Sequence, residues 1–187
     1  MRIVGGEFRG RRLAAPATSA TRPTSDRARE ALFNKLQHAH SDPVRDARVL
    51  DLFAGTGALG LEALSRGARF CLFVDILADA RANIRENIET LALQGRTKIF
   101  RRDGTRLGGI GTMAPFDLVF IDPPYNKGLA ERALASLRDG GWLNPGALCV
   151  VEEDAGVRFA PPSGYRPADQ MRQGNSALYL LKREPDL

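Results

Sequence analysis

The chain has 187 residues, of which 43% are hydrophobic and 26% are charged, proportions that are ordinary for a single soluble domain. No apolar run approaches the roughly 20 residues of a membrane span, and the N-terminus lacks the apolar segment of a signal peptide, so we expect a cytoplasmic protein. The net charge of +5 is compatible with a polyanionic partner. His38 and His40 are isolated, and Cys71 and Cys149 lie in apolar runs, which predicts buried free thiols and no metal site.

The N-terminal segment is strongly basic. Glycines interrupt its alternating pattern, and a single acid, Glu7, stands against four arginines, Arg2, Arg9, Arg11 and Arg12. We expect residues 1–20 to form a basic β-hairpin or extended arm, and residues 21–187 to form the main domain. A turn with candidate N-cap residues is expected at 21–26, and apolar residues at helical spacing then predict a helix from 28 to about 38.

From residue 48 onward, strand and helix patterns alternate. The predicted strands are 49–53, 70–75, 98–100, 116–121 and 147–151, and the predicted helices are 59–65, 78–93 and 129–137. Two further strands, near 165–166 and 176–181, meet across a Gly-Asn turn. This alternation predicts an α/β fold, with a doubly wound and mostly parallel sheet of seven strands. The final hairpin predicts an antiparallel C-terminal edge strand.

A glycine-rich loop follows the first of these strands. The segment from Gly55 to Gly60 matches G-x-G-x-x-G between a strand and a helix, and Asp75 ends the next strand. In such loops the backbone approaches a nucleotide closely and the acid binds its ribose diol. The motif alone fits a nicotinamide enzyme and an S-adenosylmethionine (SAM) enzyme equally well.

Asp51, at the end of the first strand, discriminates between these two cofactors. Its carboxylate would repel the pyrophosphate of a dinucleotide, whereas SAM carries an ammonium and a sulfonium that a carboxylate favours. Asp103, after the third strand, is placed to accept from an adenine amine, although a helix cap or turn explains it equally well when it is taken singly.

The sequence Asp122-Pro123-Pro124-Tyr125 follows the apolar run 116–121. Each proline fixes φ and lacks an N–H, so the strand ends there and its carbonyls remain free to accept hydrogen bonds. Such an acceptor cluster beside an aromatic ring suits a planar group with an exocyclic NH2, such as a nucleobase. A simple strand-ending turn is the alternative for this motif alone.

In open α/β sheets, ligands bind at the carboxyl ends of the strands, and Asp51, the glycine loop, Asp75, Asp103 and Asp122 are all expected there. In this order of motifs the chain resembles the class I SAM-dependent methyltransferases that methylate amines. The blocks 1–6, 9–11, 22–34 and 51–67 resemble one family closely, the bacterial 16S rRNA guanine-N2 methyltransferases of the RsmD family. The resemblance spans nearly the whole chain and is loose at 105–115 and over the last 25 residues.

The resemblance implies methyl transfer from SAM to the N2 amine of one guanine in 16S rRNA, with S-adenosylhomocysteine as product. The catalytic residues would be Asp122, Pro123, Pro124 and Tyr125, with the ring of Tyr125 stacked on the base. The cofactor residues would be Asp51, Phe53, Ala54, Gly55, Thr56, Gly57, Leu59, Asp75, Ile76, Asp103, Gly104 and Asp122. The RNA-binding residues would be Arg2, Arg9, Arg11, Arg12, Arg22 and Arg27.

The expected substrate is 16S rRNA, free or in the assembled small ribosomal subunit, and the expected oligomeric state is a monomer. Arg22 and Thr24 could instead contact the carboxylate of SAM. Three alternatives remain open: a DNA adenine-N6 or cytosine-N4 methyltransferase, a nicotinamide oxidoreductase, and a non-catalytic RNA-binding module with a vestigial SAM pocket. The first lacks a spare segment for a DNA-target domain, the second conflicts with Asp51, and the intact set of acids and glycines disfavours the third.

Overall fold

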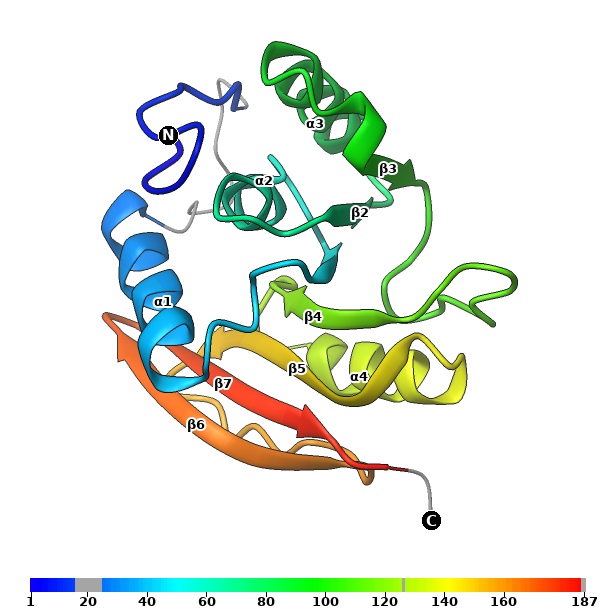
Figure 1. Cartoon of the computed structure of the whole chain (residues 1–187). Coiled ribbons are helices and arrows are strands. Elements are labelled where there is room, and N and C mark those ends of the chain that lie inside the picture. The colour runs from blue at the N-terminus through cyan, green and yellow to red at the C-terminus, as the bar shows by residue number, and fades with distance from the viewer. Residues whose placement is uncertain (16–24, 126, 186–187) are drawn as a thin grey trace.

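The computed structural model describes residues 1–15, 25–125 and 127–185, which build one sheet flanked by helices (Figure 1). The helices are α1 (Asp26–Ala39), α2 (Ala58–Ser65), α3 (Ala78–Thr90) and α4 (Leu129–Asp139), with a 3-10 turn at Gln94–Arg96. The strands are β1 (Arg48–Leu52), β2 (Phe70–Val74), β3 (Thr97–Phe100), β4 (Phe116–Ile121), β5 (Leu143–Asp154), β6 (Tyr165–Gln173) and β7 (Ser176–Arg183).

The sheet has the strand order β3-β2-β1-β4-β5-β7-β6. β1 to β5 pair in parallel, and β7 is antiparallel to both of its neighbours. The predicted α/β fold, with a mostly parallel sheet of seven strands and an antiparallel edge, is therefore confirmed. The last strand of the chain, β7, lies one position inside this edge, because the β6–β7 hairpin pairs with β5 through its second strand.

The two faces of the sheet are covered by different helices. Alternation along β1 directs Val49 into a core cluster with α1, α2 and α3, and directs Leu50 into a second cluster with α4 and Trp142. Cys71 and Cys149 are buried and free, as predicted. Of the described helices, none has the length and apolar character needed to cross a membrane.

Residues 1–15 fold back on themselves as a hairpin and pack onto the domain. Arg2 and Arg12 form an antiparallel bridge, and Ile3 N donates to Arg11 O over 2.9 Å. Ile3 and Leu13, on the inner side, are almost completely buried in the cluster that includes α1 to α3. Part of the predicted arm, residues 16–20, lies outside the described residues, as does the predicted turn up to residue 24.

A buried ion pair joins this hairpin to two helices. Arg29 of α1 and Glu62 of α2 have no exposed side-chain surface, and their Nε and Oε2 atoms are 3.5 Å apart. Glu62 Oε2 also accepts from Val4 N over 2.8 Å, and the Arg29 guanidinium donates to the carbonyl of Arg2. The buried side chains of Arg29 and Glu62 thereby fix the backbone of the arm.

The close packing of α2 on β2 depends on Gly60. A Cβ at this position would lie 2.4 Å from the ring of Phe73 and 2.6 Å from Cys71 Sγ. We predict that Gly60→Ala lowers the free energy of unfolding by about 1–3 kcal/mol, because the buried ring and the thiol must shift. Gly95→Ala is the matched control, since a Cβ at Gly95 meets nothing within 4 Å. Urea unfolding measures both variants, and equal losses would contradict this account.

Candidate active site

Acidic side chains gather where β1, β2, β4 and β5 end. Asp51 lies on β1, opposite Phe73 of β2 and Phe120 of β4. Asp75 and Asp122 directly follow β2 and β4, at the same edge of the parallel sheet. Burial raises the pKa values of Asp51 and Asp122, and the charge of Asp75 on the first and of Asp51 on the second raises them further. The edge is therefore a site of crowded carboxyl groups whose charged forms need a neighbouring cation.

The glycine loop is shaped by Asp75. One carboxylate oxygen of Asp75 accepts from Gly55 N over 2.9 Å, and the other accepts from Leu77 N over 2.8 Å. Each carboxylate oxygen has two lone pairs, so both oxygens keep one for a further donor such as a ribose hydroxyl. Asp75 therefore positions the loop and retains the acceptors that the ribose role requires.

Backbone conformations in this loop are unusual. Gly55 and Gly57 have φ of 56° and 76°, in the left-handed region that glycine tolerates. Phe53 also has a positive φ, 56°, which costs an aromatic residue about 1–3 kcal/mol and is typical of functional sites. A Cβ at Gly104 would lie 2.9 Å from the ring of Phe53, so the absent side chain at Gly104 makes room for this ring.

Asp51 lies deeper than its sequence position indicates. It is 2% exposed and accepts from Gly60 N over 3.0 Å, at the first turn of α2. Burial, with the charge of Asp75, raises the pKa of Asp51 to about 8, although the hydrogen bond from Gly60 opposes this shift. A cation beside Asp51 would stabilise its charged form.

Asp103 and Ile76 bound the region expected to hold an adenine. Asp103 accepts from both the backbone N and the hydroxyl of Thr105 over 2.8 Å, which lowers its pKa. In this structure Asp103 therefore has the contacts of a turn residue, which was the alternative to a cofactor role. Ile76 is 56% exposed directly after Asp75, although it is a large apolar side chain. Such exposure suits contact with a flat ring.

The motif at residues 122–125 lies beside two acids of β5. Burial raises the pKa of Asp122 well above its ordinary value, and the charges of Glu152, Asp51 and Glu153 raise it further. The Tyr125 hydroxyl donates to Glu152 Oε1 over 2.6 Å and lies 3.0 Å from Ser176 Oγ of β7. Burial and the hydrogen bond to Glu152 raise the pKa of Tyr125, although the contact with Ser176 opposes this shift. The two contacts fix the direction of the Tyr125 ring. Pro123 is buried and Pro124 is exposed.

Glu152 and Glu153 are site residues that the sequence analysis missed. Both are buried near the end of β5. The rule that located Asp51 and Asp122, an acid following an apolar strand, also applies to them, because they directly follow the apolar run 147–151. They bring the number of acids at this edge to five.

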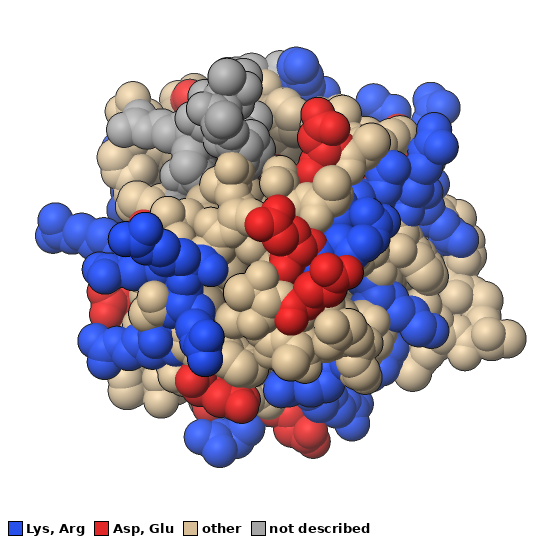
Figure 2. Space-filling view, turned by 90° about the horizontal axis from the view of Figure 1, so that it is seen from above, with Lys and Arg blue, Asp and Glu red and all other residues tan. Residues whose placement is uncertain are grey.

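The basic residues of the arm lie apart from the acids. Arg9, Arg11 and Arg12 are exposed and form no ion pair with any described residue, whereas Arg2 Nε lies 3.3 Å from Asp26 Oδ2. Arg27 is also exposed. Arg22 and Thr24 lie outside the described residues. Seen from above, one group of blue side chains lies at the left of the molecule, on the side of the arm and α1, and a second group lies at the right (Figure 2).

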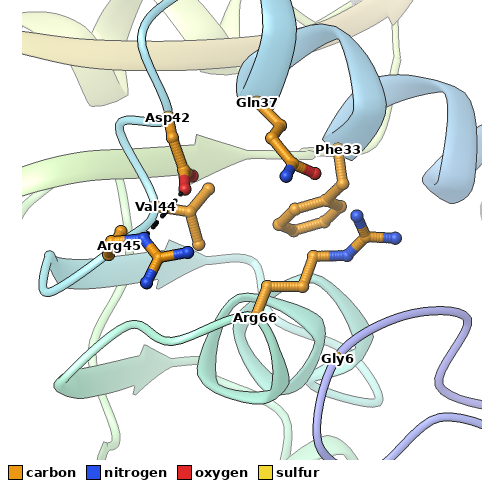
Figure 3. A pocket seen from close by; sticks show the side chains of 7 residues that line it. All are labelled: Gly6, Phe33, Gln37, Asp42, Val44, Arg45 and Arg66. Carbon is orange, nitrogen blue, oxygen red and sulfur yellow. Dashed lines mark hydrogen bonds and ion pairs between the residues drawn. The ribbon is translucent and has the colours of Figure 1, made fainter.

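Two hollows in the described surface lie away from the acidic edge. One, of about 190 Å³, is lined by Gly6, Phe33, Gln37, Asp42, Val44, Arg45 and Arg66 (Figure 3). The other, of about 420 Å³, is lined by Thr105, Gly108, Gly109, Arg132, Ala135, Ser136, Asp139 and Gly140. Neither hollow is lined by the five acids, so the candidate site is defined by its side chains and loop geometry and not by a hollow. Within the described ranges, no three His, Cys, Asp or Glu side chains are grouped to hold a metal ion.

The raised pKa of Asp51 predicts that the folded chain loses stability when this buried carboxyl group must ionise. Since its pKa is about 8 in the folded chain and ordinarily about 3.8, the unfolded chain releases this proton first, and the parent loses stability as pH rises between these values. We predict that the free energy of unfolding of Asp51→Asn, relative to that of the parent, increases by about 1–3 kcal/mol as the pH rises from 5 to 8.5. Urea unfolding at several pH values tests this. Asp46→Asn, an exposed acid whose positive φ asparagine tolerates, is the control. A constant difference between Asp51→Asn and the parent would contradict it.

The chain is similar to proteins that are already known. The family described as Conserved hypothetical protein 95 matches residues 1–182. Ribosomal RNA small subunit methyltransferase D of Escherichia coli is 40% identical over 186 residues, which cover 98% of this chain and 90% of that protein. The protein of the same name from Haemophilus influenzae is 34% identical over 167 residues, covering 88% and 84%.

A solved structure shows the same fold. The Escherichia coli protein yhhF superimposes with a TM-score of 0.83 and 35% identity, over 98% of both chains. Sequence and fold therefore agree over almost the full length, from the basic arm to the antiparallel edge. The chain belongs to the family described as Conserved hypothetical protein 95, the RsmD family of class I methyltransferases.

Proposed function

We propose that this methyltransferase transfers a methyl group from SAM to the N2 amine of a guanine in 16S rRNA, as free RNA or in the small ribosomal subunit. The observation that carries the proposal is the group of five carboxyl groups at the ends of β1, β2, β4 and β5. Such a site favours a cationic cofactor and a substrate amine. It disfavours the pyrophosphate of a nicotinamide cofactor.

The residues at this edge fit SAM. A cation such as the ammonium or sulfonium of SAM would lower the raised pKa values of Asp51 and Asp122 and favour their charged forms. The free lone pairs of Asp75 suit its ribose diol. Ile76 offers an apolar surface to the adenine, and Asp103 keeps an acceptor oxygen for its amine. When bound, the cofactor supplies an electrophilic methyl group.

The amine site is built from Asp122, Pro123 and Tyr125. The carboxylate of Asp122 and the carbonyl of Pro123 would accept the two N–H groups of the guanine amine, which aims the nitrogen lone pair away from them. The ring of Tyr125, fixed by Glu152 and Ser176, would stack on the base. The guanine must leave its own stack to enter this site. Most of the rate enhancement then comes from positioning and fixed charge.

A proton must leave the amine nitrogen once that nitrogen has gained a methyl group. Asp122 is the acceptor that already holds this N–H, and burial together with Glu152 raises its proton affinity. The proton would move to a carboxylate oxygen of Asp122 and then to water. This assignment needs no classical general base such as histidine.

The arm supplies the nucleic-acid contacts in this proposal. The two relatives named above are small-subunit rRNA methyltransferases by name, and this chain has exposed Arg9, Arg11 and Arg12 on its hairpin. Guanidinium groups bind phosphates through two parallel hydrogen bonds. Because the inner side of the hairpin is buried, these arginines lie on its outer, exposed side.

Nucleoside analysis tests the proposed function directly. The protein is incubated with labelled SAM and undermethylated small subunits, naked 16S rRNA or DNA. N2-methylguanosine in the rRNA is the expected product. Label in N6-methyladenine or N4-methylcytosine of DNA would support the DNA alternative, and no transfer to any substrate would support a non-catalytic RNA-binding module.

The amine site generates a mutational prediction. Asp122→Ala should reduce the methylation rate by at least about 100-fold, because the amine loses its acceptor, while affinity for S-adenosylhomocysteine changes only a few-fold. Single-turnover methylation and calorimetry measure the two effects. Asp139→Ala, an exposed acid at the end of α4, controls for loss of negative charge. Turnover of Asp122→Ala at the parent rate would contradict the proposed mechanism.

The arm generates a second prediction. The combined change of Arg9, Arg11 and Arg12 to Ala should weaken rRNA binding and lower the salt dependence of the logarithm of the affinity by about 2, since each lost phosphate contact contributes about 0.7–0.9. SAM affinity should stay the same. Substitution is preferable to deletion of residues 1–12, because deletion would remove buried Ile3. Arg166→Ala on β6 is the control, and an unchanged salt slope in the triple variant would exclude the arm from the RNA interface.

A further inference from the structure

Asn87 of α3 joins two segments that lie far apart in the sequence. Its side chain is 1% exposed. Its Oδ1 accepts from Ala14 N over 2.7 Å, and its Nδ2 donates to Ala14 O over 3.1 Å. The same Nδ2 donates to the carbonyl of Thr56 over 3.1 Å. One amide therefore binds the end of the arm and the middle of the glycine loop.

These three bonds satisfy almost all the hydrogen-bonding capacity of a buried amide. The two bonds to Ala14 resemble those that a neighbouring strand would make to this backbone. The third bond, from Nδ2 to the Thr56 carbonyl, joins Asn87 to the glycine loop. A buried amide without such partners would cost about 1–3 kcal/mol. A second contact also joins the arm to the glycine loop, because Thr56 Oγ1 lies 3.4 Å from Met1 Sδ.

The residues of the loop around Thr56 are bonded to their neighbours, so the loop changes conformation as one unit. Its neighbour Gly55 is held by Asp75, and Gly57 N donates to Ala54 O over 2.7 Å. The direction of the Thr56 carbonyl therefore depends on the conformation of the loop. A ligand that orders this loop also fixes the carbonyl that Asn87 binds.

We propose that Asn87 is a positioning residue that couples the glycine loop to the basic arm. Cofactor in the loop then orders the arm for rRNA, and rRNA on the arm strengthens cofactor binding by the same factor. This inference rests on the proposed function for the identity of the two ligands. The contact between arm and loop belongs to the chain itself.

The arm has other anchors, so the loss of Asn87 need not release it. Glu62 accepts from Val4 N, and Ser65 Oγ accepts from Phe8 N over 2.9 Å. Ile3 remains buried in the core. Asn87→Ala is therefore expected to fold, with the arm attached to α2 and joined to the loop only through the weak contact of Thr56 Oγ1 with Met1 Sδ.

Hydrogen exchange followed by mass spectrometry tests the coupling without any RNA. S-adenosylhomocysteine should slow exchange in residues 54–57 and 1–15 of the parent. In Asn87→Ala it should still slow exchange in the loop, while its effect on the arm is lost. Asn83→Ala is the matched control, because Asn83 lies one turn earlier on α3 and its side chain bonds to no described residue. It should behave as the parent.

Asn87→Asp tests the donor side of the amide. Aspartate keeps the acceptor for Ala14 N and loses the Nδ2 donor to the carbonyls of Thr56 and Ala14. It should therefore lose the ligand effect on the arm as Asn87→Ala does. Thermal unfolding without ligand shows whether each variant is folded.

A binding measurement extends the test to RNA. In the parent, saturating S-adenosylhomocysteine should tighten binding of 16S rRNA by about fivefold or more, the usual lower range for coupled sites. In Asn87→Ala the factor should fall to within about twofold of unity.

The outcomes separate the coupling from the proposed function. Equal protection of the arm by ligand in the parent and Asn87→Ala, or no protection of the parent arm, would overturn the coupling. Coupled exchange in a protein that does not bind 16S rRNA would leave the coupling intact and refute the substrate. No protection of the loop in the parent would refute the cofactor assignment and this inference with it.

Discussion

Mutual repulsion among carboxyl groups at one edge of the sheet is the constraint on which the site depends. Parallel strands bring Asp51, Asp75 and Asp122 together whatever their sequence separation, and Glu152 and Glu153 join them from β5. Burial makes each charge more costly, which is why the pKa values of Asp51 and Asp122 are raised. A sheet selected only for stability would carry apolar side chains here, so the energetic cost indicates a cationic ligand.

The surrounding backbone is arranged to keep these acids in place. Gly60 brings its N–H within 3.0 Å of Asp51, and Asp75 accepts from two loop amides. Gly60 can do this because it has no Cβ, so α2 packs directly on Phe73. The tight packing of the helix and the electrostatics of the site therefore have one origin, the absence of a side chain at a single position.

Much of the fold and the site follows from the sequence, and the misses have physical reasons. Apolar runs with two-residue alternation locate the buried strands, and acids after those runs locate the ligand edge. The start of β5 is missed because Pro145 and Gly146 indicate a turn, whereas the structure includes them in the strand beside a register shift opposite Phe116 and Leu118. Asn87 is missed because a polar helical residue normally faces solvent, and only the fold shows that the arm covers it.

The hairpin shows why recognition and chemistry are hard to separate in this chain. Ile3 and Leu13 belong to the same core as the helices, while Arg9 and Arg11 on the same hairpin face solvent. Because fifteen residues cannot form a stable core alone, the arginines need the domain to hold their geometry. The domain surface that holds them is formed by α1, α2 and α3, and α2 and α3 follow the glycine loop and Asp75. Under the proposed coupling, a rearrangement of the glycine loop would be transmitted to a surface that also positions the basic side chains.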